Sequence, residues 1–195
     1  MNAKGARSTD YTFFTAWRVA GSAEDVAQIL GDPVGLARWW PSVYLRVDLI
    51  HPGKENGMGR MARLHTKGWL PYTLRWTLTV TEPITGKGFA IRATGDLDGT
   101  GRWTFEQDGP EVLVTYDWRV SATKPLLRRL SWLLKPGFSA NHRWAMARGQ
   151  ESLALELRRR RAGTGTQSVP APPPPTFRGW RGVGGGWTSG FAARR

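Results

Sequence analysis

The chain has 195 residues, of which 40% are hydrophobic and none is cysteine. A chain of this length can bury one sizeable core. Without cysteine it cannot form disulfides, zinc–thiolate centres or a cysteine nucleophile. We therefore expect a reducing, cytoplasmic location. The formal net charge of +13 points toward nucleic acid, but eight arginines and no acidic residue follow Glu156, so the rest of the chain carries only 20 basic against 15 acidic residues.

Composition divides the chain into three parts. Residues 1–10 are polar and are expected to be flexible. All periodic hydrophobic patterns lie within residues 11–161, which predicts one folded domain, and no apolar run approaches the length of a membrane span. Residues 162–195 are rich in proline, glycine and arginine, so we expect a disordered tail without a dedicated role. RNA binding through the tail's arginines and tryptophans is the alternative interpretation.

A strand followed by two short helices is predicted at the start of the domain. The strand covers residues 11–20; because Arg18 interrupts its apolar stretch and no small-residue cleavage site follows, we interpret it as a strand rather than a signal peptide. Ser22 is a suitable N-cap for the first helix, whose apolar stripe consists of Val26, Ile29 and Leu30. The second helix would span residues 32–41, with Pro33 at its first helical position.

Six strands are expected to follow without an intervening helix. Alternation is clearest over residues 72–80, where large apolar side chains lie on one face and threonine or arginine on the other. The first of the six should have an apolar side made of Val43, Leu45, Val47 and Leu49. The connections are short, which requires antiparallel neighbours; turns are expected at residues 83–88, 96–99 and 108–110.

Two helices are predicted to close the domain. The first opens at Lys124, is short and basic, and is broken at residues 136–137. Its basic face could meet acidic lipid headgroups, although a solvated face is the simpler interpretation, so any membrane contact would be peripheral. The second helix covers residues 139–161 and carries one inward stripe. The element order predicts an α+β fold: a seven-stranded antiparallel sheet covered by a terminal helix.

Five short motifs distinguish this arrangement from other combinations of sheet and helix: RWWP at residues 38–41, LPYTLRW at 70–76, GDLDGTGRW at 95–103, VTYDW at 114–118, and Asn141-His142. With these motifs, residues 11–161 resemble the START-like or Bet v 1-like (SRPBCC) superfamily, and more narrowly its polyketide cyclase/dehydrase-like branch. The resemblance implies a helix-grip fold, in which a curved sheet wraps the long helix around a hydrophobic cavity. It implies no single chemistry.

The inward faces of the strands and of the last helix supply the candidate ligand contacts. Aromatic side chains are ordinary core material as well as typical pocket lining, so each can serve either purpose. On the last helix, a stripe at helical spacing combines one histidine with apolar residues and a glycine that leaves room for close approach. The predicted ligand-binding residues are Trp40, Tyr72, Trp76, Trp103, Tyr116, Trp118, His142, Met146 and Gly149.

His142 is the candidate catalytic residue, as an acid or base facing the cavity. The competing interpretation is a core histidine bonded to a backbone carbonyl or to Asn141. The other two histidines, His51 and His65, have no metal-ligand spacing relative to it and no paired carboxylates accompany them. We therefore expect neither a metal nor another cofactor.

Three functions follow from these observations. The first is binding or carriage of a hydrophobic small molecule, such as a lipid or a polyketide-like compound. The second is a cyclase/dehydratase-type reaction on such a ligand, with His142 as acid or base. The third is association with nucleic acid through the basic tail; the composition of the tail favours a disordered extension without a dedicated role instead, and a basic stripe on the folded domain would favour nucleic acid. A cavity of roughly several hundred cubic ångströms with two or more convergent polar groups would favour the enzyme, and an almost wholly apolar lining would favour the carrier.

Overall fold

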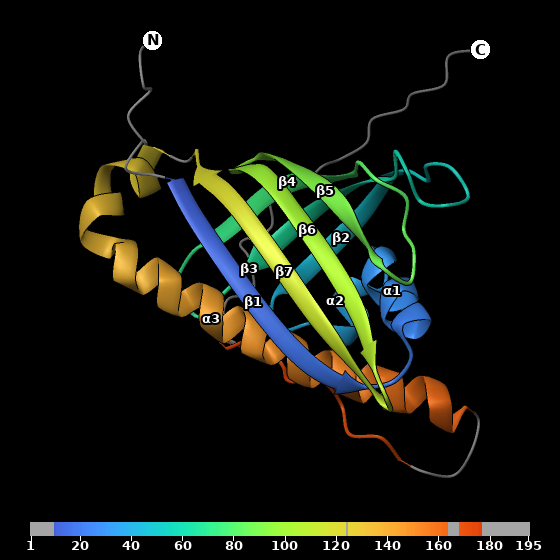
Figure 1. Ribbon diagram of the computed structural model, residues 1–195. Coiled ribbons are helices and arrows are strands. Elements are labelled where there is room, and N and C mark those ends of the chain that lie inside the picture. Colours follow the sequence, from blue (N-terminus) through green and yellow to red (C-terminus); the bar gives the residue numbers. More distant parts are fainter. Residues whose placement is uncertain (1–9, 124, 164–167, 177–195) are drawn as a thin grey trace, which may run out of the picture.

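The computed structural model describes residues 10–123, 125–163 and 168–176 (Figure 1). The expected flexible residues 1–9 and most of the expected disordered tail lie outside this part of the chain. The described residues contain one seven-stranded sheet in the order β1-β7-β6-β5-β4-β3-β2, with every neighbouring pair antiparallel. The strands are β1 Asp10–Ala20, β2 Tyr44–His51, β3 Met61–Lys67, β4 Thr73–Val80, β5 Gly88–Gly95, β6 Leu97–Asp108 and β7 Glu111–Ala122.

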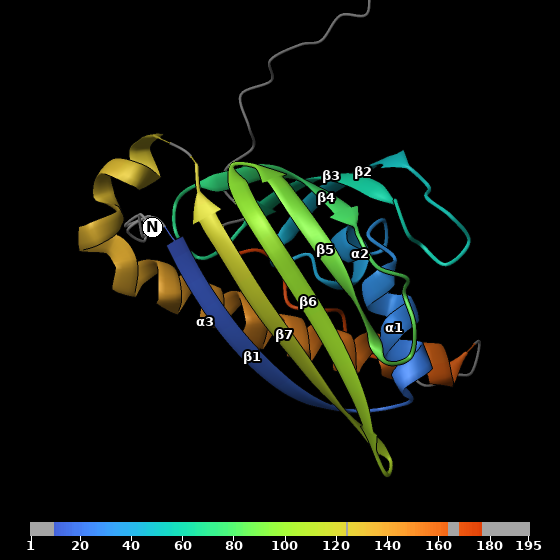
Figure 2. The same cartoon turned by 45° about the horizontal axis from the view of Figure 1, so that its top comes forward.

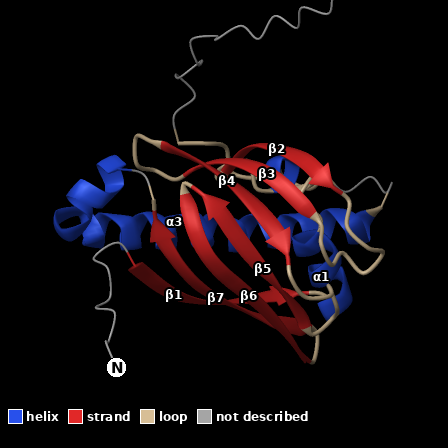
Figure 3. Cartoon of the chain, turned by 90° about the horizontal axis from the view of Figure 1, so that it is seen from above, coloured by secondary structure: helices blue, strands red, loops and turns tan. Residues whose placement is uncertain are grey.

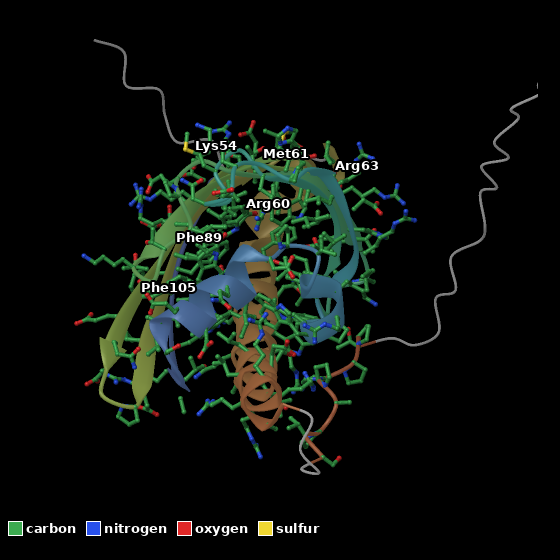
Figure 4. The ribbon with its side chains drawn as sticks, turned by 90° about the vertical axis from the view of Figure 1, so that its right-hand side faces the viewer. Lys54, Arg60, Met61, Arg63, Phe89 and Phe105 are labelled. Atoms are coloured by element: carbon green, nitrogen blue, oxygen red, sulfur yellow. The ribbon has the colours of Figure 1, made fainter. Side chains whose placement is uncertain are left out.

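Three helices accompany the sheet: α1 Ala23–Gly31, α2 Leu36–Trp39 and α3 Pro125–Ala162. The sheet curves around α3, which crosses beneath the strands (Figure 3), and a view along α3 shows the strands arching over the helix (Figure 4). The short helices α1 and α2 lie beside the C-terminal half of α3 (Figure 2). This arrangement confirms the predicted α+β helix-grip fold. No helix in the described residues is both long and apolar enough to cross a membrane.

The first helix follows its sequence signals, and the second is shorter than predicted. The Ser22 hydroxyl accepts a hydrogen bond from the backbone N–H of Asp25 (3.1 Å), which caps α1 as expected. Residues 32–35 instead form a turn, because the Asp32 carboxylate accepts from the backbone N–H of Val34 (3.1 Å). The helix ends at Trp39, since Trp40 precedes a proline and is therefore excluded from the helical region.

Strand β2 does not keep the predicted alternation. Its register with β3 shifts near both ends of the strand. Leu45 and Leu49, assigned to the apolar side, are 38% and 47% exposed, whereas Tyr44, assigned to the polar side, packs against the core together with Val43 and Val47. The assignment of the apolar side is therefore wrong, because an irregularity in register exchanges the two faces of a strand.

The two predicted C-terminal helices are one continuous helix. α3 runs through Pro136, so the predicted break at residues 136–137 is wrong. Proline removes one backbone hydrogen bond and crowds the preceding turn, which bends a helix whose flanking residues remain helical. The N-terminal turns of α3 accordingly lie at an angle to the rest (Figure 1). The basic face predicted for residues 124–135 falls on side chains that the structure does not describe.

Residues 168–176 lie against the fold after α3 ends. The Arg159 guanidinium donates to the carbonyl oxygen of Pro170 (3.1 Å), and the Thr176 hydroxyl donates to the carbonyl oxygen of Gly68 (3.4 Å). The segment thus runs back along α3 toward the loop between β3 and β4 (Figure 1). Residues 164–167 and 177–195 of the predicted tail lie outside the described residues.

Candidate ligand-binding cavity

A cavity of about 170 Å³ lies between the inner face of the sheet and the part of α3 that contains Phe138–Met146. Seven of the nine predicted ligand-binding residues border this cavity. They are Trp40, Tyr72, Trp76, Tyr116, Trp118, His142 and Met146. The curvature of the sheet brings these side chains together from α2's C-terminal end, the loop before β4, β4, β7 and α3.

Trp103 and Gly149 lie outside the cavity lining. Trp103 is paired with Tyr116 across β6 and β7 and stacks on its ring, with ring centroids 4.0 Å apart, and thus supports the cavity wall from the side. Gly149 lies beneath Trp40, where an added Cβ would be 2.3 Å from the Trp40 ring. Both residues therefore position aromatic rings that border the cavity.

The sheet side of the cavity is a connected set of aromatic rings. Tyr116 stacks on Trp118 with centroids 5.6 Å apart, and Trp118 contacts Trp76 at 5.9 Å. The neighbouring residue Gly101 makes room for this set, because a Cβ there would lie 2.4 Å from the Tyr116 hydroxyl. The turn predicted over residues 96–99 lies at the β5–β6 hairpin, whose last pair is Ala93 with Gly99; β6 nevertheless pairs with β7 from Leu97 onward.

Sequence reasoning missed several lining residues, including Tyr11 and Phe13 of β1, Tyr44 of β2, Thr66 of β3, and Phe138. The β1 residues could have been found, because four of the five odd-numbered positions from 11 to 19 carry large apolar or aromatic side chains, as an inward strand face does. β1 pairs with β7 from the other end of the domain, which brings its inner face to the cavity. Tyr44 gave no such signal, since the irregular register of β2 reverses its expected side.

His142 is half-buried at one side of the cavity, against β1. Its ring stacks on Phe13 with centroids 4.0 Å apart, and Nε2 lies 3.5 Å from the hydroxyl oxygen of Thr15. Burial and then the positive charge of Arg143 lower the pKa of His142 to about 4. The imidazole is therefore neutral at pH 7, with only about one ring in a thousand protonated. It can accept or donate a hydrogen bond but is poorly suited to act as an acid.

Asn141 connects α3 to the loop between β3 and β4 instead of bonding to His142. Its side-chain oxygen accepts from the backbone N–H of Leu70 (3.2 Å). The amide also fills the space that a side chain at residue 68 would need, since a Cβ on Gly68 would lie 2.0 Å from that oxygen. α3 thereby holds this loop at the edge of the cavity.

The lining is mainly neutral. Lys67 is the one charged side chain among the described lining residues. Burial raises the pKa of Tyr11, Tyr44, Tyr72 and Tyr116, so the four phenols remain protonated at neutral pH. In the described part of the chain, no group of three or more histidine or acidic side chains could hold a metal ion.

An ion pair with a buried carboxylate holds α2 against α3 below the cavity. The Arg38 guanidinium donates two hydrogen bonds to the Glu156 carboxylate (2.9 and 2.7 Å), and Arg159 donates a third (2.6 Å). Burial acts to raise the pKa of Glu156, but the bonds from Arg38 and Arg159 outweigh it and hold the pKa below its ordinary value. The pair thereby fixes the tryptophans that follow Arg38, including the lining residue Trp40.

Solved structures of other proteins share this fold. The Zhui aromatase/cyclase from Streptomyces sp. R1128 has a TM-score of 0.60 and 18% identity over 80% of this chain and 98% of that chain. A START superfamily protein from Mycobacterium smegmatis has a TM-score of 0.55 and 16% identity over 75% of this chain and 97% of that chain. A protein from Thermus thermophilus has a TM-score of 0.58 and 15% identity over 76% and 97% of the two chains. These identities show a shared fold alone.

The sequence profile described as polyketide cyclase/dehydrase and lipid transport matches residues 13–158. No functionally curated protein matches the chain. The matched span covers nearly all of the described domain and includes the five motifs that carried the resemblance, which is therefore confirmed. The chain belongs to the polyketide cyclase/dehydrase and lipid transport family.

Proposed function

We propose that this protein binds a hydrophobic small molecule in the cavity between the sheet and α3. The observation that carries the proposal is the lining itself: buried aromatic rings from the sheet face buried apolar residues of α3, with a small number of polar groups among them. Such a composition is typical of small-molecule sites, in which apolar surface supplies affinity and polar groups fix orientation.

The cavity volume limits the size of the ligand. An apolar cavity of roughly 150 Å³ holds one benzene ring, whereas sites for drug-sized molecules span roughly 300–1,000 Å³. A cavity of about 170 Å³ therefore accommodates a compound of one or two rings, or one end of a longer molecule that leaves past the loop between β3 and β4. The three activities in the family's description, cyclization, dehydration and lipid transport, are each compatible with a ligand, or one end of a ligand, of this size.

A cyclase- or dehydratase-type reaction is the second candidate, because His142 and several phenolic hydroxyls border the cavity. With a pKa of about 4, however, His142 is a weak base and is almost never protonated at pH 7. Substituting His142 with Ala separates the two functions. A carrier would lose at most one hydrogen bond to its ligand, which lowers the affinity by roughly 2- to 10-fold. An enzyme that uses His142 would lose about 100-fold in turnover and would still bind its ligand.

Filling the cavity tests the proposal directly. Ala145 borders the cavity on α3, while Ala147 on the same helix is exposed. We expect Ala145→Leu to weaken binding of 2-isopropenylnaphthalene, a neutral bicyclic probe followed through tryptophan fluorescence, by at least about 10-fold, and Ala147→Leu to leave it unchanged. Native mass spectrometry of freshly purified protein identifies any co-purified ligand. Equal affinities for both variants and the wild type would contradict binding in this cavity.

A further inference from the structure

We infer that the cavity selects a neutral ligand with a hydrogen-bond-accepting oxygen, and that the hydroxyls of Tyr44 and Tyr116 donate to that oxygen. The inference rests on the proposed function and adds the chemical class of the ligand. The two donors form no hydrogen bond within the described protein. Neither hydroxyl has a hydrogen-bond partner among the described residues, although Tyr116 is 7% exposed and borders the cavity.

The two hydroxyls come from strands that lie far apart in the sheet. β2 is one edge of the sheet, and β7 is next to the other edge. The curvature of the sheet brings Tyr44 and Tyr116 to one cavity, close enough for ionisation of Tyr44 to raise the pKa of Tyr116. Among the described residues, neither hydroxyl oxygen is fully sealed from water, so each is accessible to a bound molecule. Two donors that converge on one space can share one acceptor.

Packing holds both rings in place before any ligand arrives. Tyr116 is stacked between Trp103 and Trp118, at centroid distances of 4.0 and 5.6 Å, and Gly101 leaves space for its hydroxyl. The Tyr44 ring meets Trp40 edge-on at 5.2 Å. Because the rings have little freedom to lose, donation to a ligand oxygen costs little conformational entropy.

The charge of the lining favours a neutral ligand over a carboxylate. Burying an ion in an apolar site is costly unless a counter-charge compensates it. The described lining contains no arginine, its histidine is neutral, and its single cation, Lys67, lies at the end of β3 and is half-buried. A carbonyl oxygen loses much less hydration than a carboxylate and recovers it from the two phenols. A ketone, quinone or ester therefore fits better than a free acid.

Three probes of nearly the same shape test the inference. They are 2-acetylnaphthalene, which has a carbonyl oxygen, 2-isopropenylnaphthalene, which replaces it with carbon, and 2-naphthoate, which carries a charge. With wild-type protein we expect the ketone to bind at least about 5-fold more tightly than the alkene, since each hydrogen bond contributes about 2- to 10-fold. The naphthoate should bind at least about 10-fold more weakly than the ketone.

Tyrosine-to-phenylalanine variants then assign the donors. Tyr116→Phe and Tyr44→Phe should each weaken binding of the ketone by about 2- to 10-fold and leave the alkene unchanged, because only a hydroxyl is removed. Thr12→Val removes a hydroxyl from an exposed position of β1 outside the lining, so it is the control and should keep the wild-type preference. The inference is wrong if wild-type protein binds the ketone and the alkene equally. It is also wrong if naphthoate binds most tightly and Lys67→Met abolishes that binding. In both cases the proposed function stands. If none of the three probes binds, the proposed function fails as well.

Discussion

The inner stripe of α3 faces the sheet and consists of His142, Met146, Gly149, Leu153 and Leu157. Its two halves differ in the surfaces that they contact. Toward its start, His142 and Met146 border the cavity. Farther along, Leu153 and Leu157 are 0% and 1% exposed in solid packing, and Gly149 is in close contact with the Trp40 ring. The difference arises across the interface, because α1 and α2 pack beside the second half, where Arg160 bonds to Gln28 and Glu156 to Arg38. Helical periodicity thus identifies the inward face of a helix, and the opposing elements decide whether that face becomes core or cavity.

The largest expected effect is the loss of packing in the second half. Leu153→Ala should lower the free energy of unfolding by about 2–5 kcal/mol, since the fully buried side chain leaves a cavity that its neighbours cannot fill. Met146→Ala should cost less, because one side of Met146 already faces open space. Urea denaturation of both variants measures the difference. Equal losses would show that the two halves are packed alike.

The two halves should also respond to acid in separate pH ranges. The folded pKa of His142 is lowered to about 4 from 6.5, so the unfolded chain binds more protons between these values. Stability is therefore complete above pH 6.5 and falls as the pH drops toward 4, by at most about 3 kcal/mol. His142→Gln should abolish this part of the loss.

Glu156, in the packed half, acts at lower pH. Its folded pKa lies below the ordinary carboxyl value of 4.5, so its contribution is present above that value and disappears as the pH falls through the lowered pKa. Thermal unfolding of wild type, His142→Gln and Glu156→Gln between pH 8 and pH 3 separates the two groups. A loss between pH 6.5 and pH 4 that persists in His142→Gln would contradict the assignment.

Two glycines of α3 offer a matched comparison of available space. An alanine at Gly149 would place its Cβ 2.3 Å from the Trp40 ring, whereas nothing lies within 4 Å of a Cβ at Gly137. Gly149→Ala should therefore destabilise the domain by about 1–3 kcal/mol through overpacking, and Gly137→Ala should stabilise it by up to about 1 kcal/mol through helix propensity. Differential scanning calorimetry of both variants checks the opposite signs; a stabilising Gly149→Ala would mean that Trp40 yields freely.

The smallest effect is expected from removal of the tail. Residues 168–176 are joined to the fold by the bonds of Arg159 to Pro170 and of Thr176 to Gly68, both at or near the surface. Truncation after Ala162 should cost less than about 1 kcal/mol, or about 2–4 °C in Tm for a domain of this size. A control variant, Thr176→Val, removes one of the two bonds alone. A fall in Tm of more than about 5 °C on truncation would show that the segment is a structural part of the domain.

Regular alternation made most of the fold predictable. The seven strands, the capped α1 and the inward stripe of α3 all follow patterns that depend on neighbouring residues. The errors occur where a local rule has two outcomes. Pro136 can end a helix or only bend it, and the docking of the following turns on the sheet favours the bend. Leu45 and Leu49 were misassigned because register shifts depend on the pairing of β2 with β3, which a single strand does not reveal.

The sequence by itself determined the order of the elements, the absence of any cysteine chemistry, the family and seven of the nine predicted residues that border the cavity. Each of these depends on residue type and short spacing. Only the tertiary structure decided that Trp103 and Gly149 contact lining residues without bordering the cavity, that Tyr11 and Tyr44 belong to the lining, and that His142 is neutral. Those properties depend on which surfaces meet across the curved sheet and on how much water they exclude, and both arise from contacts between residues far apart in the chain.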